Sequence, residues 1–350
     1  MKVSILNVTA ASAISTFGGT DRVRVAVKGN LRLLTPVTAL LLACGSPPPP
    51  AAQLPPNSFA FGVFGDGPYR SWEVGRYRRL LKDVDAANVR WLMHVGDLFW
   101  YPCSDANLAT SLDMLNAVEV PVVYTPGDNE WTDCHEEITG RFNPLDRLQQ
   151  IRRTFFARPR KSLGAQPMAL ESQAQDSSWA EFVENQRWRF GGFLFITIHI
   201  VGSNNALAKY PGRIATEDAA ASRRTDAALA WLGQAFAIAT RDSLRGLVVA
   251  MHADPGFEVD AGAYPAYVGL IDTLAQRTKA FGRPVLLIHG DGHEYQVDHP
   301  FLRRDTLFSV FTRLETFGSP DIGWVRVVID SAAGKILRYE PRVMPRRGFW

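Results

Sequence analysis

The sequence lacks three features that would each indicate a class of protein. The apolar run at residues 33–43 is too short to span a bilayer as a stable anchor. No G-x-S-x-G motif is present, which disfavours a serine hydrolase. No internal repeat is evident either. The chain is long enough to bury a sizeable core, and its 46% hydrophobic and 21% charged residues are ordinary for a globular protein.

The sequence also lacks an excess of positive charge outside its N-terminal segment. Residues 1–43 carry five basic residues and a single acid, so that without them the formal charge of +3 becomes −1. The basic pI therefore belongs to this segment, and the rest of the chain has no charge pattern that indicates a nucleic-acid partner.

The N-terminal segment has the pattern of a signal peptide. Basic residues up to Arg32 precede the apolar run, which ends in Leu41-Leu42-Ala43-Cys44. These four residues resemble the lipobox of bacterial lipoproteins, in which the peptide is cut before the cysteine and the cysteine sulfur receives a diacylglycerol. The resemblance implies export, with Cys44 anchored in the cell envelope on the periplasmic side. A plain signal peptide with an incidental Cys44 is the alternative, and Val27 is an alternative translation start.

The rest of the chain divides into a tether and one domain. Residues 44–57 are rich in proline and suit a stiff polyproline tether, and we expect the domain at residues 58–342. Strands and helices alternate along it, which predicts an α/β fold of two packed sheets flanked by helices. Residues 165–178 are polar and predict a surface loop. The predicted strands are 59–64, 89–95, 120–125, 187–190, 193–200, 247–251, 285–289, 306–311, 324–329 and 335–339, and the predicted helices are 73–87, 107–117, 142–156, 223–239 and 265–280.

Acids and histidines follow five of the predicted strands. Three strands are each followed by Gly-Asp, which places Asp66, Asp97 and Asp128 at carboxyl ends of strands, where open α/β sheets bind ligands. Two later strands end in His252 and in the segment 289–293, which reads His-Gly-Asp-Gly-His. A cluster of carboxylates repels itself unless cations neutralise it, so this pattern predicts a metal site.

Over about residues 59–300 the order and spacing of these motifs resemble the calcineurin-like metallophosphoesterases, a superfamily that includes purple acid phosphatases. The resemblance implies a four-layer α/β/β/α sandwich of two mixed β-sheets, with the metal site at the carboxyl ends of the strands. It also implies two metal ions bridged by Asp97. The remaining implied ligands are Asp66 and His293 at one ion, and Asp128, His252 and Asp291 at the other.

The sequence departs from the family pattern at several positions. Pro68 stands where the family often has a metal-binding histidine, and Tyr69 or Tyr101 can fill that gap. Asp128 replaces the usual asparagine, and Asp291 replaces the first histidine of G-H-x-H, with His289 as the alternative ligand. These replacements make the site richer in hard oxygen ligands, which favours manganese, magnesium or iron over zinc.

The resemblance implies hydrolysis of a phosphate monoester or diester by a metal-bound hydroxide. Asn129 stands at the catalytic position where the family has an acidic histidine, so the proton for the leaving group needs another source. His135 and His199 are candidates, whereas His94 lies within a strand and is expected to be structural. The alternative is a non-catalytic metal-binding surface lipoprotein. We expect a phosphate-ester substrate, a monomer and no membrane contact beyond the lipid anchor, with phosphate contacts from Asn204, Asn205 and Arg223.

Two cysteines remain in the domain, Cys103 and Cys134. An even pair in an exported domain is a candidate disulfide, with two unpaired buried thiols as the alternative. Each lies six positions after a proposed ligand, Asp97 or Asp128. If the strands before those acids are neighbours, as the resemblance implies, the two loops leave the same sheet edge. A Cα separation suitable for a disulfide is then attainable.

Overall fold

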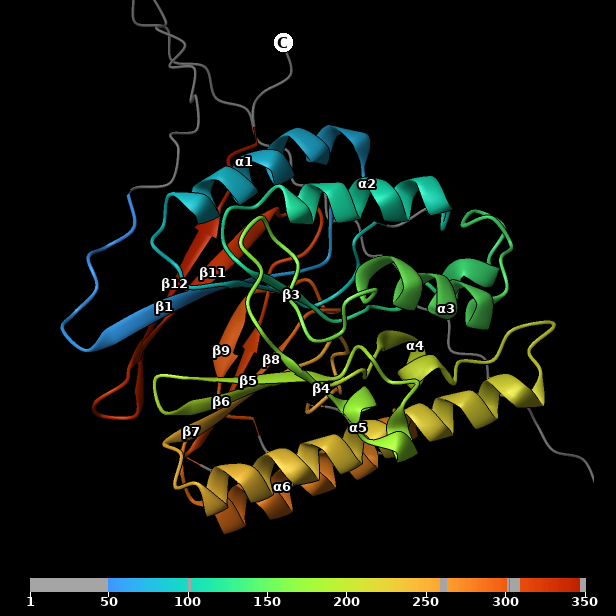
Figure 1. Ribbon diagram of the computed structural model, residues 1–350. Coiled ribbons are helices and arrows are strands. Elements are labelled where there is room, and N and C mark those ends of the chain that lie inside the picture. The colour runs from blue at the N-terminus through green and yellow to red at the C-terminus, as the bar shows by residue number, and fades with distance from the viewer. Residues whose placement is uncertain (1–49, 100–101, 259–262, 301, 303–308, 347–350) are drawn as a thin grey trace, which may run out of the picture. The chain divides into compact units, whose positions relative to one another are not determined.

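The structure is a computed structural model, and it describes residues 50–99, 102–258, 263–300, 302 and 309–346. Cys44, the segment 1–43 and Tyr101 lie outside the described residues. The described residues form an α/β fold in which two mixed β-sheets are flanked by helices, and the predicted fold class is confirmed (Figure 1). Among these residues, no helix is both long and apolar enough to cross a membrane.

The first sheet has five strands in the order β12-β11-β1-β2-β3. Strands β1, β2 and β3 are mutually parallel neighbours, while β11 runs antiparallel to both β1 and β12. The three strands that precede the Gly-Asp loops therefore end at one edge. The bounds are β1 Ser58–Phe64, β2 Leu92–His94, β3 Val122–Tyr124, β11 Gly323–Asp330 and β12 Lys335–Val343.

The second sheet has seven strands in the order β4-β5-β6-β7-β8-β10-β9. Strands β6, β7, β8 and β10 are parallel, and antiparallel strands complete both sides. His252 and the segment 289–293 follow the neighbouring strands β7 and β8. The bounds are β4 Glu171–Ser172, β5 Gln186–Phe190, β6 Phe193–Thr197, β7 Gly246–Ala250, β8 Val285–His289, β9 Gln296–Asp298 and β10 Phe311–Glu315.

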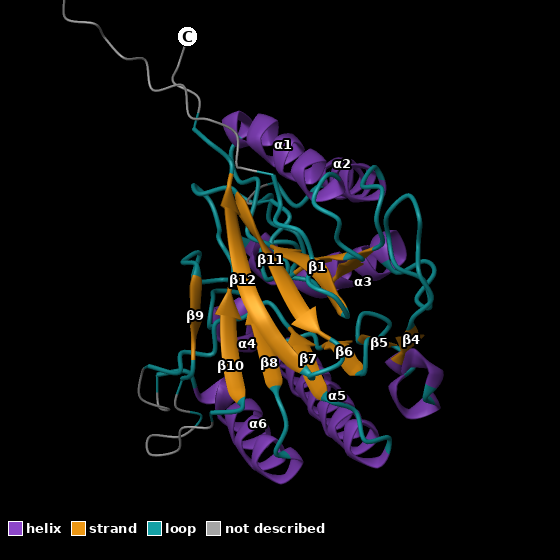
Figure 2. Ribbon diagram, turned by 90° about the vertical axis from the view of Figure 1, so that its left-hand side faces the viewer, coloured by secondary structure: helices purple, strands orange, loops and turns teal. Residues whose placement is uncertain are grey.

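Helices cover the outer face of each sheet. Figures 1 and 2 show α1 and α2 on one side of the paired sheets and α5 and α6 on the other. The bounds are α1 Val74–Asp85, α2 Asp105–Asn116, α3 Pro144–Phe155, α4 Gly202–Ala206, α5 Ala215–Arg241 and α6 Val268–Phe281, with 3₁₀ turns η1 Ser71–Glu73, η2 Thr132–His135, η3 Gln173–Gln175, η4 Ser177–Trp179 and η5 Pro265–Tyr267.

Three hydrophobic clusters fill the spaces between the four layers. Alternation along β1 sends Phe59, Phe61 and Val63 into the cluster between the sheets, while Ala60 and Phe64 pack with α1, α2 and α3. A third cluster joins the second sheet to α5 and α6. The sheets are thus held face to face, which brings the ends of β1–β3 opposite the ends of β7 and β8.

Local sequence signals placed most elements within a few residues of their observed bounds. Asn143 caps α3 by accepting from the N–H of Asp146 at 3.1 Å, and Pro144 follows at the first helical position, as predicted. One bound was wrong. The helix predicted from residue 223 begins at Ala215, because Glu217 accepts from the N–H of Ile214 and starts it earlier. The strand predicted at 306–311 lies partly outside the described residues, and β10 begins at Phe311.

The segment predicted as a polar surface loop at 165–178 is more ordered than its composition indicates. It contains β4 and the η3 turn, and Gln173 is fully buried. The Gln173 side chain donates to the carbonyl of Ala227 at 2.8 Å, which fixes the segment against α5.

Candidate metal centre

Two groups of ligand atoms come together between the ends of the two sheets. One consists of Asp66, Asp97 and His293, and the other of Asp97, Asp128 and His252, and within each group the ligand atoms all lie within 4.8 Å of one another. Asp97 belongs to both groups. The structure therefore gathers five of the six predicted ligands into two adjoining clusters that share the residue proposed as the bridge.

The closest contacts join histidines of one sheet to acids of the other. His252 Nε2 lies 2.8 Å from Asp128 Oδ1 and 3.3 Å from Asp97 Oδ1. His293 Nε2 lies 3.6 Å from Asp66 Oδ1. The Tyr69 hydroxyl donates to Asp97 Oδ2 at 2.5 Å and lies 3.3 Å from His293 Nε2. Tyr69 is therefore at the first group.

Backbone carbonyls orient both histidines toward this space. His252 Nδ1 lies 2.8 Å from the carbonyl of Val95, and His293 Nδ1 lies 2.9 Å from the carbonyl of Ser319. A ring that donates from Nδ1 keeps its Nε2 lone pair for a cation.

Four of the six predicted ligands have a left-handed backbone. Their φ angles are +54° at Asp66, +59° at Asp97, +71° at Asp291 and +66° at His293. This conformation is uncommon outside glycine and costs of order 1 kcal/mol or more at each position. Strain of this kind persists where the surrounding structure enforces it, and its concentration here indicates a functional site.

The glycines of these loops leave room for acids from other ligand loops. A Cβ added at Gly127 would lie 2.1 Å from Asp97 Oδ1, and one added at Gly290 would lie 2.2 Å from Asp66 Oδ2. A side chain at either position would displace a predicted ligand. The glycines of the ligand loops therefore make space for the acids that the neighbouring loops supply.

The buried acids are poorly compensated by protein groups. Burial raises the pKa of Asp66 to about 8, against the opposing influence of His252, and burial also holds the pKa of Asp97 well above its usual range. Asp66 Oδ2 is buried and has no hydrogen-bond partner among the described residues. A cation would satisfy this oxygen and stabilise the ionised carboxylates. The donor set therefore fits bound metal.

Asp291 and His289 were left as alternative ligands by the sequence. Asp291 Oδ1 lies 3.7 Å from His252 Nε2, and the Asp291 N–H donates to Asp66 Oδ1 at 3.0 Å. Along β8, His289 lies on the same face as Leu287, which packs toward α5 and α6, whereas Ile288 faces the other sheet. Neither residue belongs to the two ligand groups. Asp291 is favoured because it contacts His252 and Asp66, which belong to these groups.

The three residues considered for catalysis have different environments. The Asn129 N–H donates to Asp97 Oδ1 at 3.1 Å, so Asn129 touches the centre through its backbone. The half-buried His135 ring stacks on Tyr210 at 3.6 Å between centroids. His199 is fully buried with Nδ1 2.8 Å from Glu184, and burial lowers its pKa to about 4. Neither histidine is in the two ligand groups.

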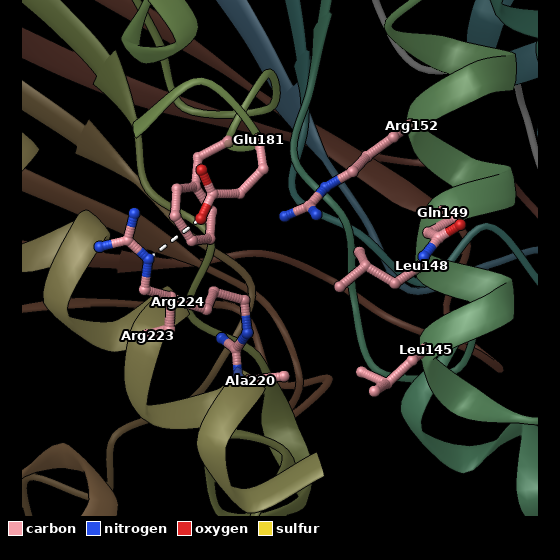
Figure 3. Close-up of a pocket in the computed structure, with 9 residues that line it drawn as sticks. Leu145, Leu148, Gln149, Arg152, Glu181, Ala220, Arg223 and Arg224 are labelled. Carbon is pink, nitrogen blue, oxygen red and sulfur yellow. Dashed lines mark hydrogen bonds and ion pairs between the residues drawn. The ribbon is translucent and has the colours of Figure 1, made fainter. Parts of the chain in front are cut away.

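The residues expected to bind phosphate lie in two different parts of the structure. Asn204 and Asn205 lie in α4, where Asn204 lines a hollow beside Asp291 and Asn205 is buried. Arg223 lies in a different pocket between α3 and α5, where its Nε donates to Glu181 at 3.0 Å (Figure 3). No residue that lines this second pocket is a predicted metal ligand.

Glu130 is the main residue of the site that sequence reasoning missed. It is fully buried and accepts from the N–H groups of Leu98 at 2.8 Å and Gly127 at 3.1 Å, so that it joins the two loops that carry Asp97 and Asp128. Its position just after Asp128 and Asn129 was visible in the sequence. Its partners are set by the parallel pairing of β2 and β3, which the sequence did not reveal.

The same two loops are joined by a disulfide. Cys103 and Cys134 are bonded, with a Cα separation of 5.7 Å, and both are fully buried. The structure therefore contains the predicted disulfide rather than two unpaired thiols.

Comparisons with known proteins give limited information. No protein-family model matches the chain, and no curated protein does. Among solved structures, the chain is similar to the crystal structure of TT1561 of Thermus thermophilus, at 11% identity and a TM-score of 0.44, over 82% of this chain and 99% of that chain. At these values the likeness carries no functional argument, and the function has to be inferred from the site.

Proposed function

We propose that the protein is a metallophosphoesterase of the calcineurin-like superfamily, which hydrolyses phosphate monoesters or diesters with two metal ions. The observation that carries the proposal is the pair of ligand groups that share Asp97. Two adjoining cation sites with a common carboxylate can clamp the attacking and leaving oxygens of an in-line displacement at phosphorus.

The residues divide naturally between the two ions. Asp66, Asp97 and His293 would hold the first ion, and the Tyr69 hydroxyl, which already contacts Asp97, would add an oxygen beside it. Asp97, Asp128 and His252 would hold the second, with Asp291 next to His252. Four carboxylates and a phenol form a hard donor set, which favours manganese, magnesium or iron over zinc.

The bound ions would neutralise the phosphoryl group and activate water for attack. The protein itself would orient the ligands through the Val95 and Ser319 carbonyls and hold the loops through Glu130. Burial of Asp66 and Asp97 keeps bulk water from competing for the cations.

Metal analysis and a substrate screen test the proposal. The purified protein should contain close to two metal ions per chain, and after metal removal it should regain turnover of phosphate esters with manganese, magnesium or iron. A protein that binds no metal at this site would contradict it.

A second candidate is a non-catalytic metal-binding lipoprotein. It is favoured by Asn129, which stands where the family has its proton-donating histidine and contacts Asp97 only through the backbone. A protein that binds two metals but turns over no monoester or diester would support this candidate instead.

The proposal includes export and anchoring through Cys44, with the protein acting as a monomer in the periplasm. Its support is the resemblance of Leu41-Leu42-Ala43-Cys44 to a lipobox. Mass spectrometry of the mature protein should find a diacylated cysteine at its N-terminus. A mature N-terminus downstream of Cys44 would exclude the anchor.

A further inference from the structure

A hollow of about 330 Å³ adjoins the candidate metal centre. It shares Asp291 with that centre, and its wall includes Ser203, whose hydroxyl lies 3.0 Å from Asp128 Oδ2. An ester whose phosphate bridged the two ions could therefore extend its organic group into this space. The other described residues that line it are Asn204, Asp254, Tyr264, Tyr267 and Gly292.

The lining carries negative charge and no positive charge. Asp254 is half-buried at the wall, and none of the described lining residues is a lysine or an arginine. The carboxylates of Asp66, Asp97, Asp128 and Asp291 together match the charge of two divalent ions. A bound phosphate ester and Asp254 then leave an excess of negative charge, which a positive charge on the organic group would offset.

An aromatic ring stands at the same wall. Tyr264 is 45% exposed, while its neighbour Tyr267 is buried and fixed by donating to the carbonyl of Val201 at 2.7 Å. The two ring centroids are 6.2 Å apart. Tyr264 and Asp254 line the same hollow, and a tyrosine ring can bind an ammonium group because its quadrupole attracts cations.

We propose that the hollow binds an alkylammonium group carried by the organic part of the substrate. This inference rests on the proposed phosphoesterase function and names its substrate class. Asp254 supplies the charge complementarity and Tyr264 the cation–π contact.

Three phosphomonoesters of equal length test the inference. Choline phosphate carries a positive charge, 3,3-dimethylbutyl phosphate is its neutral isostere, and 3-phosphonooxypropanoate carries a negative charge. With metals restored, kcat/KM should fall in that order, with about a tenfold preference for choline phosphate over the neutral ester. Equal values, or a preference for the neutral or the anionic ester, would overturn the inference and leave the phosphoesterase function standing.

Substitutions test whether the preference for choline phosphate arises in the hollow. Asp254→Asn and Tyr264→Ala should each reduce the ratio of choline phosphate to neutral ester toward one. Asp113→Asn, an acid of α2, is the matched control and should keep the wild-type ratio. A ratio that survives both substitutions would show that the preference arises elsewhere and would overturn the assignment.

A binding measurement keeps the test independent of turnover. Choline should shift one tyrosine resonance of the metal-loaded protein labelled at its tyrosine rings, whereas 3,3-dimethylbutanol should not, and Tyr264→Phe should identify that resonance by removing it. If none of the three monoesters is turned over, the proposed function is limited to diesters, and this titration still decides whether the hollow binds ammonium. Equal shifts from both alcohols, or none, would overturn the inference.

Discussion

The two sheets supply different sets of residues to the candidate metal centre. The first sheet supplies Asp66, Asp97 and Asp128 from three neighbouring parallel strands, whereas the second sheet supplies His252, Asp291 and His293 from two. The first sheet thus concentrates negative charge at one edge. Neither sheet alone contains either of the two ligand groups, so the centre depends on the packing of one sheet against the other.

The two edges are also braced differently. On the first sheet, Glu130 and the disulfide between Cys103 and Cys134 connect the loops after β2 and β3. On the second, the ligand segment after β8 is held by hydrogen bonds across the interface, from the Asp291 N–H to Asp66 and from His293 to Ser319. The edge with the stronger mutual repulsion has the additional connections, which indicates that they keep the acids close before metal binds.

Asp97→Asn should have the largest effect, because Asp97 is the residue that both ligand groups share. We expect loss of both metals and a fall in kcat of about a thousandfold or more, as for a lost metal site. Without metal, the variant should unfold no more easily than the metal-free wild type. Burial already disfavours the charged form of Asp97, whose pKa is held well above its usual range, so a neutral side chain is tolerated there.

Metal content, kcat and urea unfolding of the Asp97→Asn variant check this, with Asp113→Asn as the matched control. Wild-type turnover in the variant would show that Asp97 does not bridge two metal ions. Loss of fold would show instead that Asp97 is needed for structure.

Removal of the disulfide tests the bracing of the acidic edge. The bond spans 31 residues, and in the chain-entropy model a loop of this size contributes about 3–4 kcal/mol to stability. The double variant Cys103→Ser, Cys134→Ser should lose about this much in urea unfolding, and its metal affinity should fall because the two loops are less confined. Metal affinity equal to that of the wild type would show that the bond stabilises the fold without organising the centre.

Glu130→Gln tests the second connection within the same edge. The amide keeps the size of the side chain but has a single acceptor oxygen, so it can no longer accept from both Leu98 and Gly127, which should cost about 2 kcal/mol of stability. Metal affinity should fall about 10- to 100-fold, as expected when a residue that supports metal ligands is changed. Glu119→Gln, an exposed acid, is the control, and equal metal affinities of the two variants would refute the supporting role.

The sequence predicted the parts of the site that depend on short, repeated signals. The Gly-Asp pairs mark carboxyl ends of strands, and the segment 289–293 offers both His289 and Asp291 as ligands. The parts that it could not predict depend on contacts between distant segments. Tyr69 and Tyr101 were equivalent by sequence, and only the folded loop places Tyr69 against Asp97, 28 positions away.

The environment of His199 also depends on contacts between distant segments, which the sequence could not predict. His199 was a candidate proton donor within the predicted strand 193–200, but its partner is Glu184, 15 residues earlier, and Glu184 is in turn held by Arg152 of α3. No short-range signal connects these three residues. Burial lowers the pKa of His199 to about 4, so the side chain is neutral at the pH at which a proton donor would be needed.

The smallest predicted effect concerns this buried histidine on the second sheet. Because the pKa of His199 is about 4 in the folded protein and about 6.5 in the unfolded chain, the unfolded state binds the extra proton between these values. His199 therefore reduces stability as the pH falls from about 6.5 to 4, and it should contribute a loss of about 2 kcal/mol between pH 7 and pH 5.

His199→Gln removes this titration and retains an amide that can donate to Glu184. Urea unfolding at both pH values in the presence of EDTA, so that metal release does not contribute, should show a pH-dependent loss smaller by about 2 kcal/mol in the variant. Parallel losses in the two proteins would show that His199 accepts a proton in the folded state at pH 5, and His199 would then return as a candidate proton donor.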